Sequence, residues 1–362
     1  MTSPHQTTIA SWDPASFRVA VQRTLDGFVD SQAERLAELG SDAERLVTAA
    51  RNAVSGGKRF RAQFCYWGFR AVQDERYDEE RLVRAAAALE LLHASALVHD
   101  DYMDASDVRR GRPATHRAFE QQHRDARWGG DPQQYGAAAA ILLGDLLLSW
   151  ADELLRTSGF DKERVLDALG YFDTTRGEVI AGQFLDVSVQ ARRASDVEAA
   201  MTVLRYKSAK YSVERPLHIG AALAGADPEV FEALSAFGLP LGEAFQLRDD
   251  LLGVFGDPAL TGKPAGDDLV EGKRTVLVAL ALEHAPEEEA RHLDRSLGTA
   301  LEPGEVDALR GIIERSGAHT RVETMIDELT GRCLSALEAA PVTESAREVL
   351  RELAAAATQR VV

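Results

Sequence analysis

Three aspartates lie close together in the segment LVHDDYMD. Positions i, i+1 and i+4 of an α-helix fall within about 100° of arc, so Asp100, Asp101 and Asp104 share one side of a helix. Carboxylates at a helix C-terminus repel one another and are disfavoured by the helix dipole. Mg²⁺ would hold them, since it is bound by one or two carboxylates together with substrate phosphates. A solvated helix end is the alternative, but the two preceding turns are almost wholly apolar.

Arginines follow this acidic box in the segment DVRRGRP. The guanidinium groups of Arg109 and Arg110 suit bidentate contacts with phosphate. The acidic and basic clusters could instead neutralise each other. We favour a polyphosphate held through metal on one side and through arginine on the other. Zinc is not expected, because no set of His and Cys residues has the spacing of a zinc site.

A second acidic pair, Asp249 and Asp250, lies in the segment FQLRDDLLG. Two metal-binding helix faces could hold one leaving group from opposite sides. Lys263 follows in a Gly- and Pro-rich turn that superficially resembles a nucleotide-binding P-loop. That interpretation fails because Gly256 is one residue out of register and Pro264 stands where Ser or Thr is needed.

Further cations lie elsewhere in the chain. The segment GGKRFR places Lys58 and Arg61 at a glycine-rich helix start, which favours an anion. His93 lies two helical turns before Asp100 and on the same side, although a core histidine would fit equally. The segment KSAK, from Lys207, interrupts a helical stretch, and a kinked helix with solvated lysines is its alternative. Together these cations exceed the need of one diphosphate, which suggests two phosphate-bearing substrates.

The elements that carry these residues are predicted to be helices. Apolar residues recur at three- to four-residue steps from Asp78 to Ser106, as one buried helix face requires. Similar periodicity covers roughly residues 14–39, 41–54, 59–73, 135–157, 162–190, 196–223, 228–255, 268–283, 303–316, 318–339 and 343–358. Alternating strand patterns are nearly absent. We expect a single all-α helical bundle domain over residues 1–362.

The composition excludes several classes of protein. The 362 residues carry a net charge of −17, which disfavours nucleic-acid binding. Two cysteines provide no disulfide framework and fit a reducing compartment. The first residues lack a signal-peptide pattern, and we find no window of the ~18 uncharged apolar residues that a membrane span needs. We therefore expect a soluble cytoplasmic protein.

The ordered motifs GGKRFR, HDDYMD with RRGRP, KSAK, and FQLRDD with TGKPAGDDLVEGKRT cover residues 56–275. This set resembles the trans-isoprenyl diphosphate synthase (polyprenyl synthetase) family. The resemblance implies an all-α fold around a deep apolar cavity, Mg²⁺ dependence and a homodimer. It also implies condensation of an allylic diphosphate with isopentenyl diphosphate. The allylic diphosphate ionises, isopentenyl diphosphate attacks the resulting cation through its double bond, and a proton is lost.

The resemblance also implies residue roles. Mg²⁺ would be held by Asp100, Asp101, Asp104, Asp249 and Asp250. The allylic diphosphate would be contacted by Arg109, Lys207 and Lys263, and isopentenyl diphosphate would be bound by Lys58, Arg61, His93 and Arg110. Dipoles near the developing cation would come from Ser208 and Gln246. Gly253 departs from the family pattern by replacing the third Asp of the second motif, and Asp257 could substitute for it. Ser208 replaces the usual Thr, and Ala62 stands where Pro is common.

Product length is expected to depend on the residues four and five positions before Asp100. In the family these often form the cavity floor, and here they are the small residues Ala96 and Ser95. The resemblance therefore points to geranylgeranyl diphosphate, with farnesyl or longer polyprenyl products as alternatives. A larger residue, such as Phe119 or Leu92, could set the limit deeper in the cavity.

Two other functions fit the sequence less well. A class I terpene cyclase shares the fold, but it has no need of the basic cluster at Lys58, Arg61 and His93, and Gly253 and Asp257 do not match its second metal motif. A non-catalytic regulatory subunit of a synthase would be favoured by loss of one acidic pair, and both pairs are present.

Overall fold

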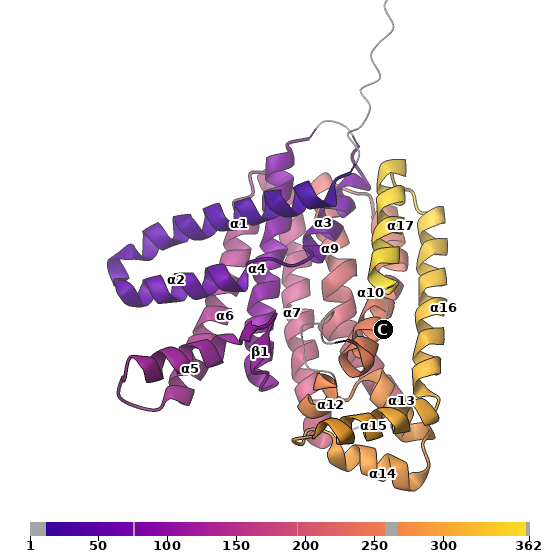
Figure 1. The fold of residues 1–362 in the computed structure, drawn as a ribbon. Helices are drawn as coiled ribbons and strands as arrows, with labels where there is room; N and C mark the ends of the chain where they lie inside the picture. Colours follow the sequence, from indigo (N-terminus) through magenta and orange to yellow (C-terminus); the bar gives the residue numbers. More distant parts are fainter. Residues whose placement is uncertain (1–11, 75–76, 194, 258–265, 360–362) are drawn as a thin grey trace, which may run out of the picture.

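The computed structural model describes residues 12–74, 77–193, 195–257 and 266–359. Helices dominate these residues (Figure 1). They are α1 (Pro14–Leu36), the 3₁₀ helix η1 (Ala37–Leu39), α2 (Ser41–Ala53), α3 (Phe60–Arg70), α4 (Glu79–Met103), α5 (Thr115–Asp125), α6 (Pro132–Arg156), α7 (Lys162–Arg192), α8 (Val197–Val203), the π-helix η2 (Leu204–Glu214), α9 (Arg215–Ala224), α10 (Pro228–Phe255), α12 (Asp267–Glu271), α13 (Val276–His284), α14 (Glu287–Ser296), α15 (Pro303–Arg315), α16 (Ala318–Ala339) and α17 (Glu344–Thr358). The all-α prediction is confirmed.

The long helices pack side by side around the centre of the molecule (Figure 1). Helix α4 packs on α6, α3 on α9, and α10 on α16 and the π-helix. Buried apolar side chains form two clusters, a larger one built around α1, α3, α4, α6, α7 and α9, and a second one between α10 and the C-terminal helices α12 to α16. Both clusters support helices that carry the predicted site residues.

Local sequence signals account for several helix starts. The side chain of Asp78 caps α4 by accepting a hydrogen bond from the amide of Arg81, and Asp131 caps α6 in the same way from Gln133. Helices α1, α6, α10 and α15 each have proline in the first turn, where the missing N–H costs no helical hydrogen bond. Capping thus fixes where the long helices begin.

Helix α4 is also the one helix among the described residues that is long and apolar enough to cross a membrane. In this fold 72% of its most apolar window is buried inside the protein. Its hydrophobicity is therefore accounted for by its central position in the larger core.

The predicted helices 228–255 and 318–339 agree with α10 and α16. Helices α5 and α14 were not expected, because both are strongly polar and α14 buries only Leu293. A short antiparallel hairpin, β1 (Val108–Arg109) with β2 (Arg112–Pro113), was also not expected. Arg110 and Gly111 both have positive φ, as two-residue hairpin loops require.

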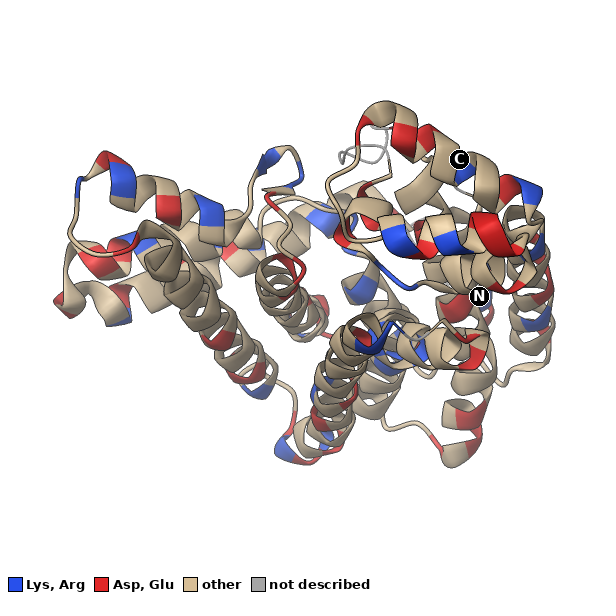
Figure 2. Ribbon diagram, turned by 90° about the horizontal axis from the view of Figure 1, so that it is seen from below, with Lys and Arg blue, Asp and Glu red and all other residues tan. Residues whose placement is uncertain are grey.

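Charged residues are distributed over the outer helices. In the view of Figure 2, positions of Lys and Arg are interspersed with positions of Asp and Glu along the described ribbons. This mixed pattern agrees with an acidic protein whose two kinds of charge pair locally, as in the many ion pairs between neighbouring turns.

Helices α3 and α9 approach each other backbone to backbone at two glycines. A Cβ atom on Gly220 would lie 1.9 Å from the carbonyl oxygen of Cys65, and one on Gly68 would lie 2.2 Å from that of Leu217. Real Cβ contacts are never this short, so these helices need glycine at both positions. The close approach matters for the site because α3 carries Arg61 and α9 continues the π-helix.

We predict that Gly220→Ala lowers the free energy of unfolding by about 1–3 kcal/mol, because the added methyl group forces α3 and α9 apart. Gly170→Ala is the matched control: it adds the same methyl to helix α7, where nothing lies within 4 Å, and should stabilise the protein by up to about 1 kcal/mol. Urea unfolding of both variants and the wild type tests this. Wild-type stability in Gly220→Ala would contradict the prediction.

Candidate active site

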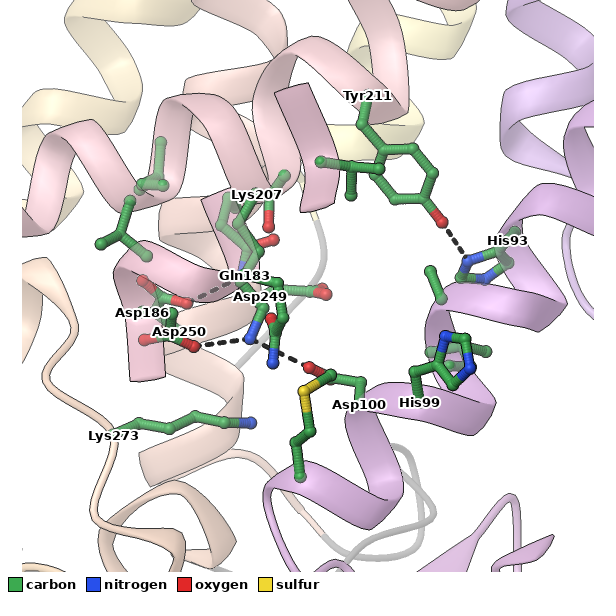
Figure 3. A pocket seen from close by; sticks show the side chains of 18 of the residues that line it. His93, His99, Asp100, Gln183, Asp186, Lys207, Tyr211, Asp249, Asp250 and Lys273 are labelled. Carbon is green, nitrogen blue, oxygen red and sulfur yellow. Dashed lines mark hydrogen bonds and ion pairs between the residues drawn. The ribbon is translucent and has the colours of Figure 1, made fainter. Parts of the chain in front are cut away.

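A cavity of about 1280 Å³ lies among α4, α7, the π-helix and α10 (Figure 3). Among the residues singled out from the sequence, those that line it are Lys58, Arg61, Leu92, His93, Ser95, Ala96, Asp100, Arg109, Arg110, Lys207, Ser208, Gln246, Asp249, Asp250 and Gly253. Apolar side chains complete its wall, notably Leu148, Val179 and Ile180. The structure thus brings together motifs that are up to about 190 residues apart in sequence. Lys263 lies outside the described residues.

The two acidic motifs occupy opposite walls of this cavity. Asp100 projects from α4, while Asp249 and Asp250 lie on α10 across the opening (Figure 3). On α4, residues 92, 96 and 100 fall at successive turns and all line the cavity, so an apolar stripe runs directly into the acidic residue. The polar and apolar parts of the cavity are therefore continuous.

Lys207 joins the acidic wall of α4 to α7. Its ammonium lies 3.1 Å from an oxygen of Asp100 and 2.6 Å from Asp186 (Figure 3). Burial opposes the charge of Lys207, but these two carboxylates outweigh it and raise the pKa of the lysine. The π-helix places Lys207 here, and such wide turns are frequent at functional sites. The alternative expected from the sequence, a solvated lysine, does not apply, because the side chain of Lys207 is largely buried.

Lys273 places a second buried ammonium group among carboxylates, near α12. Its ammonium lies 2.6 Å from Glu271, 3.3 Å from Asp268 and 3.9 Å from Asp104. Burial disfavours the charged lysine, but the surrounding carboxylates, first of all Asp268, raise its pKa well above the ordinary value. Two buried ammonium groups therefore offset the repulsion among the carboxylates of this site.

The carboxylates nevertheless differ in protonation. Burial raises the pKa of Asp104 to about 7, with a further contribution from the charge of Asp100. Burial likewise raises the pKa of Asp250 to about 8, although the amide of Gln246 donates a 2.8 Å hydrogen bond to it. For Asp100, Lys207 and Lys273 outweigh burial and lower the pKa. The site holds more negative charge than its lysines neutralise.

Asp101 points away from the cavity that Asp100 lines. It accepts a 2.8 Å hydrogen bond from Nε of Arg109 and a second one from the same guanidinium. The expected convergence of all three aspartates is therefore not seen, because a salt bridge turns Asp101 toward the β-hairpin. Its assignment as a metal ligand stays a prediction, as does that of Asp104, which is buried beside the cavity.

The donor set fits Mg²⁺ bound together with a substrate. Within the described ranges, no group of three or more acidic, His or Cys side chains forms a ready-made metal site. Such a site is not required, because Mg²⁺ takes several ligands from water and phosphate. Oδ2 of Asp104 is buried and makes no hydrogen bond within the part of the chain that is described. Asp100, Asp104, Asp249 and Asp250 therefore offer oxygen atoms suited to Mg²⁺.

A cationic pocket adjoins the acidic walls. Arg61 lies over the ring of Tyr211 at 4.1 Å and donates a 2.8 Å hydrogen bond to Ser212. Burial and the charges of neighbouring arginines, first Arg59, lower the pKa of Arg110. Burial and the charge of Arg61 also hold the pKa of His93 well below its ordinary value, so its imidazole is neutral. This accumulation of cations is suited to bind an anion.

Several polar residues of the cavity were not identified from the sequence. Tyr211 holds His93 through a 2.6 Å hydrogen bond, and Gln183 and Asp186 reach the site from α7. The polar pair in the otherwise apolar stretch VIAGQFLDV was a usable signal. Lys273 also lines the cavity, although its segment GDDLVEGKRT suggested no role for it. Phe119, considered as a possible floor, packs against Tyr135 and does not line the cavity.

Helices packed around a largely apolar cavity, with acidic residues on facing walls, define the isoprenoid synthase class of all-α enzymes. The family model for polyprenyl synthetase matches residues 43–314. This match covers more than half of the chain, and the chain belongs to the polyprenyl synthetase family.

Individual proteins agree with this assignment. A crystal structure of geranylgeranyl pyrophosphate synthase from Corynebacterium glutamicum, complexed with isoprenyl diphosphate and magnesium, has 41% identity and a TM-score of 0.94 over 97% of this chain and all of that one. A short chain isoprenyl diphosphate synthase from Methanothermobacter thermautotrophicus is 35% identical over 79% of this chain and 82% of its own. A geranylfarnesyl diphosphate synthase from Natronomonas pharaonis is 32% identical over 86% of this chain and 89% of its own.

Proposed function

We propose that this trans-prenyltransferase condenses an allylic diphosphate with isopentenyl diphosphate, in a Mg²⁺-dependent reaction, to make geranylgeranyl diphosphate. The observation that carries the proposal is the pair of facing acidic walls, Asp100 on α4 and Asp249 with Asp250 on α10, in one cavity with an apolar wall and a cationic pocket. Residues 1–362 act as one domain, with the motifs at 56–275 as its core.

The acidic walls form the subsite for the allylic diphosphate. Asp100, Asp104, Asp249 and Asp250 would hold Mg²⁺, which would supply positive charge to the departing diphosphate. Lys207 adds a fixed cation, and so does the guanidinium of Arg109, which Asp101 orients from the other side. Charge placed in advance around the leaving group lowers the barrier to ionisation. Lys263 has the same role by resemblance.

The cationic pocket binds isopentenyl diphosphate. Lys58, Arg61 and Arg110 supply the charge, while neutral His93 supplies a hydrogen-bonding nitrogen. Nε of Arg61 is buried and makes no hydrogen bond within the described residues, so a diphosphate oxygen would satisfy it. The cationic pocket and the acidic walls thus form two adjoining diphosphate subsites of one cavity.

The bond-forming step takes place between these subsites. Ser208 on the π-helix and Gln246 on α10 both line the cavity and place their dipoles near the allylic cation. The apolar side chains of the wall offer water no hydrogen-bonding partners, which protects the cation from being quenched. The small side chains of Ala96 and Ser95 leave room for a chain to grow past the first turn of α4 below Asp100.

The protein acts as a homodimer in the cytoplasm. Several apolar side chains on α6 and α7 are exposed, including Leu142 at 61%, Ile180 at 58% and Phe184 at 73%. Ile180 and Phe184 also line the cavity, so its apolar wall is open to solvent on this side. A second copy packed on α6 and α7 would bury these side chains and close the wall.

We predict that Asp100→Ala, and likewise Asp101→Ala, lowers kcat by at least ~10²–10³, because each removes charge that positions the diphosphate or its metal. Turnover is measured with an allylic diphosphate, isopentenyl diphosphate and Mg²⁺. Asp173→Ala on the exposed surface of α7 is the matched control and should retain activity. Near-normal kcat in both site variants would refute their roles.

We predict that Ala96→Phe shortens the product, because an aromatic ring one turn below Asp100 blocks the growing chain. Sizing of the products by chromatography after incubation with each allylic primer tests this. Ser95→Ala, which changes the neighbouring residue without adding volume, is the control. A product of unchanged length from Ala96→Phe would exclude Ala96 from the cavity floor.

We predict that Leu142→Asp shifts the protein from dimer to monomer, because it places a charge in the exposed apolar face of α6 and α7. Val19→Asp on α1, where the apolar residue is 59% exposed, is the matched control and should remain dimeric. Sedimentation velocity at several protein concentrations gives the oligomeric state. A monomeric wild type, or a dimeric Leu142→Asp variant, would contradict this interface.

A further inference from the structure

The glycine-rich turn before α3 contains a buried arginine. Lys58 and Arg61 line the cavity, whereas Arg59, which lies between them in sequence, does not and is only 4% exposed. The φ angle of Arg59 is +56°, a left-handed conformation that residues with a side chain rarely adopt. Such a conformation persists where the surrounding structure fixes it. The turn that presents Lys58 and Arg61 therefore depends on the contacts of Arg59.

Glu90 on α4 is the charged partner of this arginine. Nη1 of Arg59 donates a 3.1 Å hydrogen bond to Oε2 of Glu90, and both side chains are buried. The other carboxylate oxygen, Oε1, accepts a 3.2 Å hydrogen bond from the amide of Ala62. This amide lies in the first turn of α3, where it has no partner within the helix. Glu90 thus binds both the turn and the start of the helix that follows it.

The second guanidinium nitrogen of Arg59 reaches two more helices. Nη2 donates a 2.5 Å hydrogen bond to the carbonyl oxygen of Val54, at the end of α2, and another to Oε1 of Gln22 on α1. The same oxygen of Gln22 accepts a 3.2 Å hydrogen bond from the amide of Gly56. One guanidinium therefore connects the glycine-rich turn to α1, α2 and α4.

Glu90 also lies beside the cationic pocket without lining it. It precedes His93 by three residues on α4, so both side chains are on the same face of that helix. Arg110 donates a 2.8 Å hydrogen bond to the carbonyl oxygen of Ser55, in the same turn as Arg59. Burial, and then the charge of Arg59, lowers the pKa of Arg110, whereas the charge of Glu90 acts in the opposite direction. Glu90 therefore offsets the repulsion among these guanidinium groups.

We propose that the buried pair of Arg59 and Glu90 is the positioning unit of the isopentenyl diphosphate subsite. The pair holds Lys58 and Arg61, at the start of α3, in register with His93 on α4. Arg59 and Glu90 act through these neighbours, since neither lines the cavity. The proposal rests on the proposed function, because it assigns positioning residues to the cationic pocket of the same cavity.

The charge of Glu90 gives the test a definite sign. A carboxylate near a cationic pocket repels a diphosphate, so loss of its charge alone would strengthen the binding of isopentenyl diphosphate. If Glu90 acts by positioning, loss of its charge instead leaves the guanidinium of Arg59 buried without its counter-ion. The turn then loses its fixed geometry, and binding of the diphosphate weakens. The two effects have opposite directions.

The test uses Glu90→Gln, which keeps the shape of the side chain and removes its charge. We expect KM for isopentenyl diphosphate to rise about 10–100-fold, the loss that a misplaced binding group causes, while KM for the allylic diphosphate stays constant. Glu120→Gln is the matched control. Glu120 on α5 is buried and accepts hydrogen bonds from Arg117 and Arg124, but it does not line the cavity, so both KM values should stay constant.

Arg59→Lys is the second variant, and thermal unfolding reports whether each variant is folded. Lysine keeps the positive charge opposite Glu90, but its single ammonium group lacks the planar fork that reaches three segments at once. KM for isopentenyl diphosphate should rise here too, by a smaller factor. If Glu90→Gln does not fold, Arg59→Lys decides. An unchanged or lower KM for isopentenyl diphosphate in a folded variant, or an equal rise for both substrates, would overturn the proposal.

The two proposals can fail separately. If the wild type forms product from the two diphosphates, but Glu90→Gln and Arg59→Lys leave KM for isopentenyl diphosphate unchanged, only the positioning role is wrong. If the wild type forms no product and binds no isopentenyl diphosphate in isothermal titration, the proposed function itself is wrong.

Discussion

Repulsion among buried carboxylates is the constraint on which this structure depends. Aspartates from α4, α7, α10 and α12 meet in one cavity, and in water-poor surroundings their charges could not stay together unaided. Lys207 and Lys273 offset this repulsion by placing one ammonium group at each of two carboxylate clusters. Burial, and after it the charge of neighbouring aspartates, nevertheless raises the pKa values of Asp104 and Asp250. The site therefore favours the binding of a ligand that brings additional positive charge.

The helices are arranged to meet this constraint. Gly182 allows the backbone of α7 to approach Lys207, since a Cβ there would lie 2.4 Å from the lysine amide nitrogen. The π-helix widens the backbone at the same point, so Lys207, Ser208 and Tyr211 all line the cavity. A regular α-helix would distribute these residues differently around its axis. The π-helix thus positions side chains in the site, while the long regular helices hold the opposite walls of the cavity apart.

The cavity lining contributed by one helix was predictable from the sequence, because the spacing of residues on a helix fixes which of them share a face. Asp100, Ala96 and Leu92 follow that spacing, and all three line the cavity. Contacts between helices were not predictable in the same way. Asp186 reaches Lys207 from α7, and periodicity alone does not reveal which helices face each other. The turn of Asp101 toward Arg109 likewise depends on a hairpin that has two-residue strands and no alternating pattern.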